Sequence, residues 1–339
     1  MTRTTAPTLE DVARMAGVST ASISRALNDP DKVAKPTRDK IEKAIDVLGY
    51  TPNFGGRALA SNRTNTVGAI IPSMANAMFA SGVQAFQEVL SEAGVNLLLA
   101  STGYDPDQEL RQIKALITHG ADGLLLIGDA RPQTTRDFLA KRRVPHVISW
   151  CFRPDADHLY VGFDNRRAAY DATRQVLALG HRRIAMISGV RDGNDRARDR
   201  HAGVAAAIAD FGQGAALLQL HEAKYRLEFG AEAFVRIMSS DDLPSVIMCG
   251  NDVLAAGALM RARDMGVEVP GRVSLVGFDD IGLASVVTPP LATVRVPQIE
   301  MGRAAARMLI ARLSGDVSAT PVQLSTEFIH RASLAPPTP

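Results

Sequence analysis

The chain has 339 residues, of which 46% are hydrophobic, and a formal net charge of only +2. This length exceeds what one simple core can organise, so two or three domains are expected. No apolar run approaches the ~18 residues of a membrane span, and the start MTRTTAPTLEDV carries no signal segment, which predicts a cytoplasmic protein without membrane contact. Cys151 and Cys249 end separate apolar runs and are expected to be buried small hydrophobes rather than a disulfide or a metal site.

Residues 8–28, TLEDVARMAGVSTASISRALN, predict two short helices joined by a tight turn. Thr8 is a favoured N-cap, Gly17 suits a left-handed helix end, and Ser19 can cap the second helix. Apolar residues recur at helical spacing in both halves. This pattern favours a helix-turn-helix, and the alternative is an ordinary helical hairpin within a larger helical domain.

The second of these helices leaves short polar side chains and one long donor, Arg25, outside its apolar face. Such a face can enter a DNA major groove and place Arg25 on a guanine edge. Because Thr20 and Ala21 are short, Arg25 is expected to carry much of the direct readout. The other contacts expected from this helix, to bases or phosphates, are Ser19, Thr20, Ala21, Ser22, Ser24 and Asn28.

A third helix is predicted from about Pro36 to Leu48, with Gly49 ending it, which completes a small bundle. Residues 1–63 hold ten Lys and Arg against seven Asp and Glu, so the mild positive charge is confined to this part of the chain. Residues 50–62 resemble a linker with a short, weak helix.

From Val67 apolar strands alternate with amphipathic helices, which predicts parallel sheets covered on both faces. Strands are expected at 67–72, 95–101, 122–128, 146–151, 160–164, 183–189, 216–221, 245–250, 273–280, 293–296 and 322–329. Helices are expected near 77–93, 106–119, 133–141, 201–211, 226–238, 254–265 and 299–312. Two successive doubly wound units predict two lobes with a cleft between them, and the final segments are expected to cross back between the lobes.

Polar and aromatic residues near the strand ends are the candidates for a ligand site, because ligands of such sheets bind beyond the carboxyl ends of the strands. They are Ser73, Phe79, Tyr104, Asp129 and Trp150 in the first lobe, and Arg198, Asn251, Asp252 and Asp279 in the second. An aromatic face with one arginine and several Asn or Asp acceptors suits a polyhydroxylated ligand. Three alternatives stay open: core packing for Trp150, a turn or helix cap for Asp279-Asp280, and a solvated charged face for residues 195–200.

Enzyme motifs are weak in this sequence. His221-Glu222 lacks the second histidine of a zinc helix, and Gly212-Gln213-Gly214 does not follow a strand as a dinucleotide loop would. Asp279-Asp280 could be the carboxylate pair of a glycosidase, but adjacent residues at a strand end point in opposite directions. The sequence therefore predicts no enzyme, no cofactor and no metal.

The segments TLEDVARMAGVSTASISRALN and TRDKIEKAIDVLGYTPN resemble the headpiece of the LacI/GalR family of transcriptional regulators, and VGAIIPSMANAMFA, LGHRRIAMISG and GRVSLVGFDDIGLASVVTPPLATVRVP resemble its core. The resemblance implies an N-terminal all-α helix-turn-helix headpiece and an α/β two-lobed, periplasmic-binding-protein-like core of doubly wound parallel sheets. The expected parts are a headpiece (1–51), a hinge helix or linker (52–64), an N-terminal effector-binding subdomain (65–163 with 294–325) and a C-terminal one (164–293 with 326–339).

In this family the hinge helix folds on the operator and pairs with its dimer mate in the minor groove, where a leucine at the place of Leu59 wedges into the central base step. Gly55-Gly56 stands where less flexible residues are usual, and each glycine costs a helix about 1 kcal/mol against alanine. A hinge that is harder to order is therefore expected. The expected DNA contacts are completed by Thr8, Tyr50, Asn53, Arg57, Leu59 and Ala60.

The resemblance also assigns effector residues. The family's effector arginine lies five residues before a glycine, which matches Arg198 and Gly203, and its pocket asparagine and aspartate match Asn251 and Asp279. Trp150 stands where sugar-responsive members often carry an aspartate. Trp150 and the segments TGYDPDQE and VGFDN together resemble the gluconate-repressor branch of the family. This resemblance implies that the effector is a sugar acid, whose carboxylate would pair with Arg198.

The expected function is that of a sequence-specific DNA-binding transcriptional regulator, a repressor that binds a palindromic operator as a homodimer. A carbohydrate or sugar-acid effector would bind in the cleft between the lobes and change the separation of the two hinges. The effector could act as inducer or as corepressor. Two alternatives stay open: an activator or dual regulator of the same build, and a cytoplasmic sugar-binding or sugar-converting protein.

Overall fold

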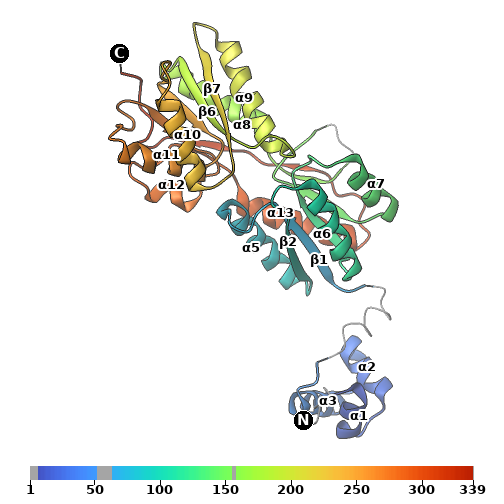
Figure 1. Cartoon of the computed structure of the whole chain (residues 1–339). Coiled ribbons are helices and arrows are strands. Elements are labelled where there is room, and N and C mark those ends of the chain that lie inside the picture. Colours follow the sequence, from blue (N-terminus) through green and yellow to red (C-terminus); the bar gives the residue numbers. More distant parts are fainter. Residues whose placement is uncertain (1–6, 52–62, 155–157, 339) are drawn as a thin grey trace. The chain divides into compact units, whose positions relative to one another are not determined.

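The computed structural model describes residues 7–51, 63–154 and 158–338, and it divides into two compact units, Met1–Thr64 and Asn65–Pro339 (Figure 1). Residues 52–62 of the expected hinge, which include Asn53, Gly55-Gly56, Arg57, Leu59 and Ala60, lie outside the described residues. No helix of the described ranges is both long and apolar enough to cross a membrane.

The first unit is the predicted helix-turn-helix bundle. Its elements are α1 (Leu9–Ala16), α2 (Thr20–Asn28), a short 3-10 helix (Pro30–Lys32) and α3 (Lys35–Leu48). Thr8 caps α1 by accepting the Asp11 N–H at 3.3 Å, and the Asp11 carboxylate accepts the Thr8 N–H at 3.0 Å. Gly17 ends α1 at φ 67°, a left-handed conformation that glycine adopts without strain. The core of the bundle is formed by Val12, Ala13, Ile23, Ile41, Ala44 and Tyr50.

The first lobe of the second unit is built on a six-stranded parallel sheet of order β11-β5-β4-β3-β1-β2. Its strands are β1 (Thr66–Ile71), β2 (Asn96–Ser101), β3 (Gly123–Ile127), β4 (His146–Ser149), β5 (Tyr160–Gly162) and β11 (Val322–Gln323). Its helices are α5 (Ala77–Glu92), α6 (Pro106–Thr118), α7 (Gln133–Arg142) and α13 (Gln298–Leu313). Successive strand residues face opposite sides, so Ala69 packs with α5 and α13 while Ile70 packs with α6 and α7.

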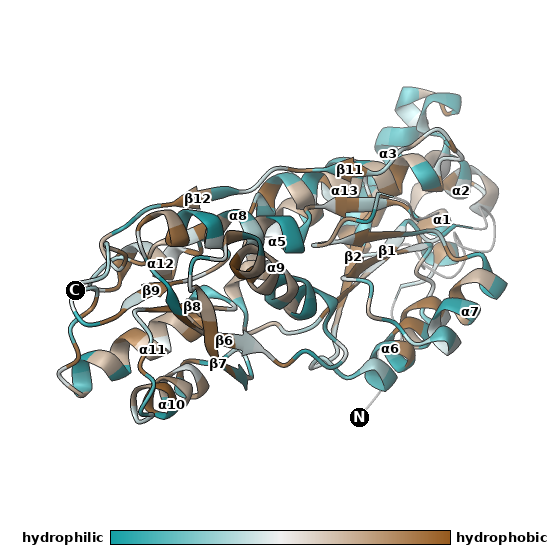
Figure 2. Cartoon of the chain, turned by 90° about the horizontal axis from the view of Figure 1, so that it is seen from above, coloured by the Kyte–Doolittle hydropathy of each residue, from teal (hydrophilic) through white to brown (hydrophobic). Residues whose placement is uncertain are grey.

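The second lobe is built on a four-stranded parallel sheet of order β7-β6-β8-β9. Its strands are β6 (Arg183–Gly189), β7 (Ala216–Ala223), β8 (Val246–Cys249) and β9 (Ser274–Val276). Its helices are α8 (Asn165–Ala178), α9 (Asp195–Phe211), α10 (Leu227–Met238), α11 (Asp252–Asp264) and α12 (Gly282–Val286). Figure 2 shows hydrophobic residues concentrated on the strands and hydrophilic ones on outer helices such as α6 and α7.

Several elements differ from the sequence-based expectation, among them the short helix α12, which was not predicted. Helix α8 was not predicted, because most residues on its buried face are alanine or threonine and give a weak apolar pattern. Helix α9 begins at Asp195 rather than near residue 201. The predicted strand 322–329 is two strands: β11 joins the first sheet, and β12 (Glu327–Ile329) pairs antiparallel with β10 (Thr293–Arg295). The boundaries expected between the two subdomains remain predictions.

Candidate functional site

The face of α2 that the sequence assigned to DNA is exposed. Ile23 is fully buried in the bundle, which turns Thr20, Ala21, Ser24 and Arg25 to the surface. Ser19 caps the helix by accepting the Ser22 N–H at 3.2 Å, and the two serine hydroxyls are 2.9 Å apart. The cap and the core contact hold this helix firmly, as a helix that reads bases must be held. The side chain of Asn28 lies outside the described part of the structure.

Two other predicted DNA contacts already have structural partners. The Thr8 hydroxyl donates to Asp11 at 2.7 Å, although the residue stays exposed at the start of α1. Tyr50 is only 8% exposed and belongs to the core of the bundle, so most of its ring stabilises the headpiece rather than facing a ligand.

Residues that follow the strands of the two lobes contact one another. The Asp129 N–H of the first lobe donates to Asp195 of the second at 2.8 Å. The rings of Tyr104 and Tyr225, one from each lobe, have centroids 5.7 Å apart. A cavity of about 30 Å³ lies at this junction, lined from the first lobe by Ile71, Thr102, Tyr104, Ile127 and Arg131 among others, and from the second by Gly193, Asp195 and Arg196. The cleft therefore presents aromatic rings and arginine donors, which suits an oxygen-rich ligand.

A buried ion pair underlies the second-lobe wall of this cleft. Arg200 contacts the Asp279 carboxylate at 3.3 Å, donates to the Gly250 carbonyl at 2.7 Å and to Asn165 at 2.9 Å, and lies 3.7 Å over the Phe278 ring. Burial raises the pKa of Asp279 to about 7, and the charge of Arg200 opposes this rise. Asp280 instead pairs with Arg295 and Arg331. The adjacent carboxylates therefore have separate partners, unlike a glycosidase pair.

Arg198 does not lie with the other candidates. It is exposed on α9, and its guanidinium donates to the Arg191 carbonyl at 3.2 Å. Residues four apart share a helix face, so Arg196 and Arg200 point inward together and are 5% and 3% exposed. The expectation that Arg198 faces the cleft is therefore wrong: of the arginines on α9, Arg196 lines the cavity, and Arg200 is buried against Asp279. The alternative of a solvated charged face therefore holds for Arg198, whereas Asp195 and Arg196 are buried and pair at 3.0 Å.

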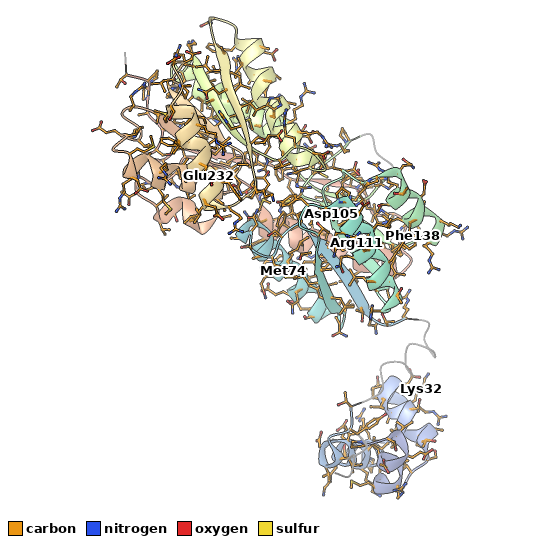
Figure 3. The ribbon with its side chains drawn as sticks, viewed as in Figure 1. Lys32, Met74, Asp105, Arg111, Phe138 and Glu232 are labelled. Atoms are coloured by element: carbon orange, nitrogen blue, oxygen red, sulfur yellow. The ribbon has the colours of Figure 1, made fainter. Side chains whose placement is uncertain are left out.

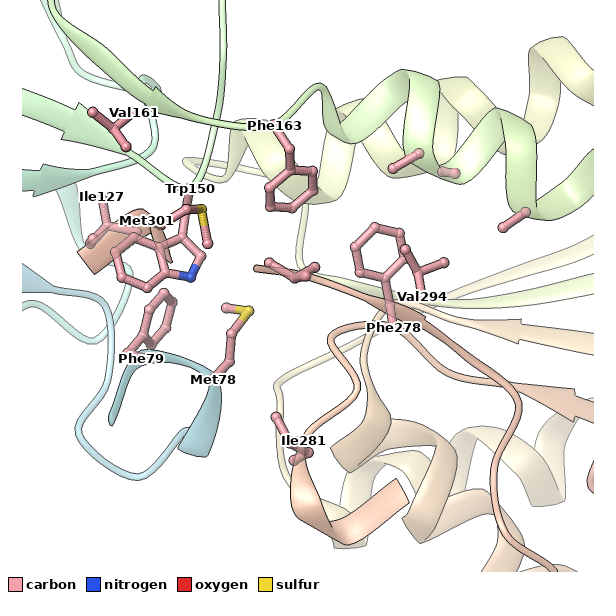
Figure 4. Packing of buried hydrophobic residues seen from close by; sticks show 14 of the residues in the cluster. Met78, Phe79, Ile127, Trp150, Val161, Phe163, Phe278, Ile281, Val294 and Met301 are labelled. Carbon is pink, nitrogen blue, oxygen red and sulfur yellow. The ribbon is translucent and has the colours of Figure 1, made fainter. Parts of the chain in front are cut away.

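Trp150 and Phe79 pack in the core of the first lobe beside the cleft (Figure 4). Their rings meet edge to face at 5.7 Å, and neither residue is exposed. A Cβ at Gly82 would come within 2.5 Å of the indole, so only glycine allows this packing. The indole Nε1 has no hydrogen-bond partner among the described residues. The contacts of Trp150 are therefore those of a core residue, which is one of the two interpretations that the sequence left open.

The remaining candidates support backbone turns. Ser73 accepts the Ala75 N–H at 3.2 Å, and Asn251 caps α11 by accepting the Leu254 N–H at 2.9 Å. Cys151 and Cys249 are buried free thiols, as expected. Sequence reasoning missed Arg196, Arg200 and Tyr225. The four-residue spacing of the two arginines was a usable signal, whereas the contact between Tyr225 and Tyr104 depends on the fold.

Comparison with known proteins agrees with this geometry. Residues 8–53 match the model of bacterial regulatory proteins of the lacI family, and residues 173–334 match a periplasmic binding protein-like domain. The chain is 32% identical over 330 residues to the HTH-type transcriptional repressor CytR of Escherichia coli, covering 97% of this chain and 96% of that protein. Among solved structures it resembles a complex of the transcriptional regulator CelR with cellobiose, with a TM-score of 0.70 and 30% identity over 96% of this chain and 99% of that one. It shares the fold of the lac repressor dimer bound to operator and an anti-inducer, with a TM-score of 0.86 and 23% identity over 98% of this chain and all of that one.

Proposed function

Because the chain belongs to the lacI family of DNA-binding transcriptional regulators, we propose that it is a repressor that binds a palindromic operator as a homodimer. The observation that carries this proposal is the capped, exposed face of α2 with Arg25 at its surface. A single short recognition helix buries too little surface for tight binding, and a two-fold dimer reads two half-sites. The name of CytR as a repressor and the operator-bound lac repressor dimer support the same proposal.

Exposed apolar side chains support self-association. Leu98 and Leu99 are 36% and 41% exposed on β2, which is an edge strand of the first sheet. Met74, labelled in Figure 3, is 57% exposed near the start of α5. Exposed apolar side chains, among them two on an edge strand, are a common feature of subunit interfaces, and a second copy of this chain is the partner we propose for them.

We further propose that a carbohydrate or sugar-acid effector binds the cleft between the lobes. Arg200 uses its donors on Asn165, Gly250 and Asp279, whereas Arg196 lines the cavity itself. Arg196 is therefore the residue we assign to a ligand carboxylate, in place of Arg198. The similarity to the complex of CelR with cellobiose supports a carbohydrate-type effector for this chain.

The test is a titration of operator-bound protein with gluconate, related sugar acids and the parent sugars, using an operator obtained by selection. Arg196→Lys keeps the charge but loses the planar guanidinium. The concentration of the active acid that gives a half-maximal response should therefore rise about tenfold or more. Arg198→Lys is the matched control on the exposed face of the same helix and should change nothing. Equal responses of the two variants, or no response of the native protein to any acid or sugar, would contradict the effector assignment.

A further inference from the structure

A charged contact joins the lobes beside the cavity. Arg153 lies in the first lobe, on the connection between β4 and β5, and its Nη2 is 2.7 Å from Asp199 and 3.7 Å from Asp195 of α9. Asp195 also accepts the Asp129 N–H at 2.8 Å. The Asp195 and Asp199 carboxylates, both near the start of α9 in the second lobe, therefore bind two groups of the first lobe: the Arg153 guanidinium and the Asp129 N–H.

The local structure prepares these carboxylates for that contact. Asn194 caps α9, and Asp195 is the first residue of the helix, where the positive end of the helix dipole favours a negative charge. Burial alone would raise the pKa of Asp195, but Arg196 and the Asp129 N–H hold it below its usual value. Burial raises the pKa of Asp199, and Arg153 opposes this effect. The Arg153 guanidinium therefore stabilises the ionised form of the Asp199 carboxylate.

This contact lies outside the ligand cavity. The cavity is lined by Asp195 and Arg196 but not by Arg153 or Asp199. The side chains of Arg153 and Asp199 are 33% and 22% exposed, so the pair is partly shielded from solvent and is stronger than a pair on an open surface. Changing this pair would alter how firmly the lobes are joined without removing a group that touches the ligand.

We propose that Arg153 and Asp199 form an interlobe tether that sets the closed arrangement of the lobes and thereby the effector concentration to which the protein responds. The second half of this statement rests on the proposed effector cleft. A ligand that contacts both lobes binds fully only to the closed arrangement, so its apparent affinity is reduced by the fraction of molecules that are open. Each residue of the pair acts through lobe closure and is a positioning residue.

The test measures the lobe distance directly in the full-length protein. Lys141→Cys on α7 and Lys224→Cys after β7 place fluorescent labels on exposed sites of the two lobes, and the native thiols are buried. Labelled protein is mixed with excess unlabelled protein so that only distances within one chain are read. Arg153→Gln and Asp199→Asn should each broaden the distance distribution toward open lobes. The double variant Arg153→Asp/Asp199→Arg should restore it.

The matched control is Arg167→Gln, which breaks an ion pair of 2.8 Å with Asp171 inside the second lobe and should leave the distance unchanged. The same variants are then titrated with the active effector. Arg153→Gln and Asp199→Asn should each require an effector concentration at least about threefold higher for a half-maximal response. Unchanged distances in both single variants would overturn the tether. Broadened distances in a protein that responds to no sugar or sugar acid would support the tether while the proposed effector fails.

Discussion

At the scale of single residues, Arg25 is the side chain that we propose reads a base pair. It is exposed on α2, and its guanidinium can donate two hydrogen bonds to one guanine. Arg25→Ala should therefore lose about 1–3 kcal/mol of discrimination at one base pair of each half-site. Binding titrations against single-base operator variants measure this. Arg14→Ala, an exposed arginine on α1 that pairs with Asp11, is the control and should leave base preference unchanged. If Arg25→Ala keeps the native base preference, the direct-readout assignment fails.

Asp252 predicts a pH-dependent stability. It is fully buried, and burial together with the nearby Asp279 raises its pKa from 3.8 to about 8. Between about pH 4 and pH 8 the folded protein holds a proton that the unfolded chain releases, so this residue's contribution to stability falls as pH rises.

Asp252→Asn should remove that dependence, because an amide does not titrate between about pH 4 and pH 8. The variant should still fold, since an amide can accept the Ile281 N–H and bond to the Thr293 hydroxyl. Urea unfolding of both proteins at several pH values tests this. The stability of the native protein relative to the variant should fall with rising pH, by at most about 1.4 kcal/mol for each pH unit. Parallel curves across the window would show that Asp252 does not titrate there.

The arginines of α9 show where residue-level prediction fails. A run of alternating acidic and basic residues looks the same in sequence whether it is solvated or forms buried pairs. Only the start of the helix at Asp195 decides which face each residue takes, and helix starts are hard to place within charged runs. The surface position of Arg25 and the position of Asp279 near a strand end could be predicted, because local sequence alone places them there.

At the scale of elements, the contact between α5 and α13 depends on two glycines. A Cβ at Gly302 would lie 2.0 Å from the Gly82 carbonyl, so the helices approach as closely as their backbones allow. Gly302→Ala should therefore push the helices apart and destabilise the protein by about 1–3 kcal/mol. Gly282→Ala is the control, because a Cβ there meets nothing within 4 Å. Thermal unfolding of the two variants measures the difference, and equal midpoints would contradict the close approach.

The strands were predictable for a physical reason. Strands buried on both faces, such as β1 and β3, are continuous apolar runs that stand out from their surroundings. Helix α8 was missed because packing against α9 needs small residues: a Cβ at Gly203 would meet the Arg166 carbonyl at 2.2 Å, and alanines line the facing surface. Small residues at a close helix crossing leave little apolar signal in sequence.

At the scale of the whole molecule, the fold class could be predicted and the contact between the lobes could not. Headpiece motifs and alternating strands and helices are local in sequence, and the expected helix-turn-helix unit with a two-lobed α/β core is confirmed. The bond from Asp129 to Asp195 joins residues 66 positions apart, and no local pattern encodes it. The proposed regulation depends on such contacts, since effector binding must change how the lobes meet.

We propose above that this protein reads DNA sequence as a two-fold symmetric regulator. The most direct measurement is selection of bound sequences from random duplexes by the full-length protein at low salt, repeated with sugar acids and sugars added. We predict a two-fold palindrome with matching half-sites, whose recovery changes with one compound. Enrichment of no sequence, under conditions where even phosphate contacts hold, would contradict DNA recognition, and a single half-site without symmetry would contradict the dimer.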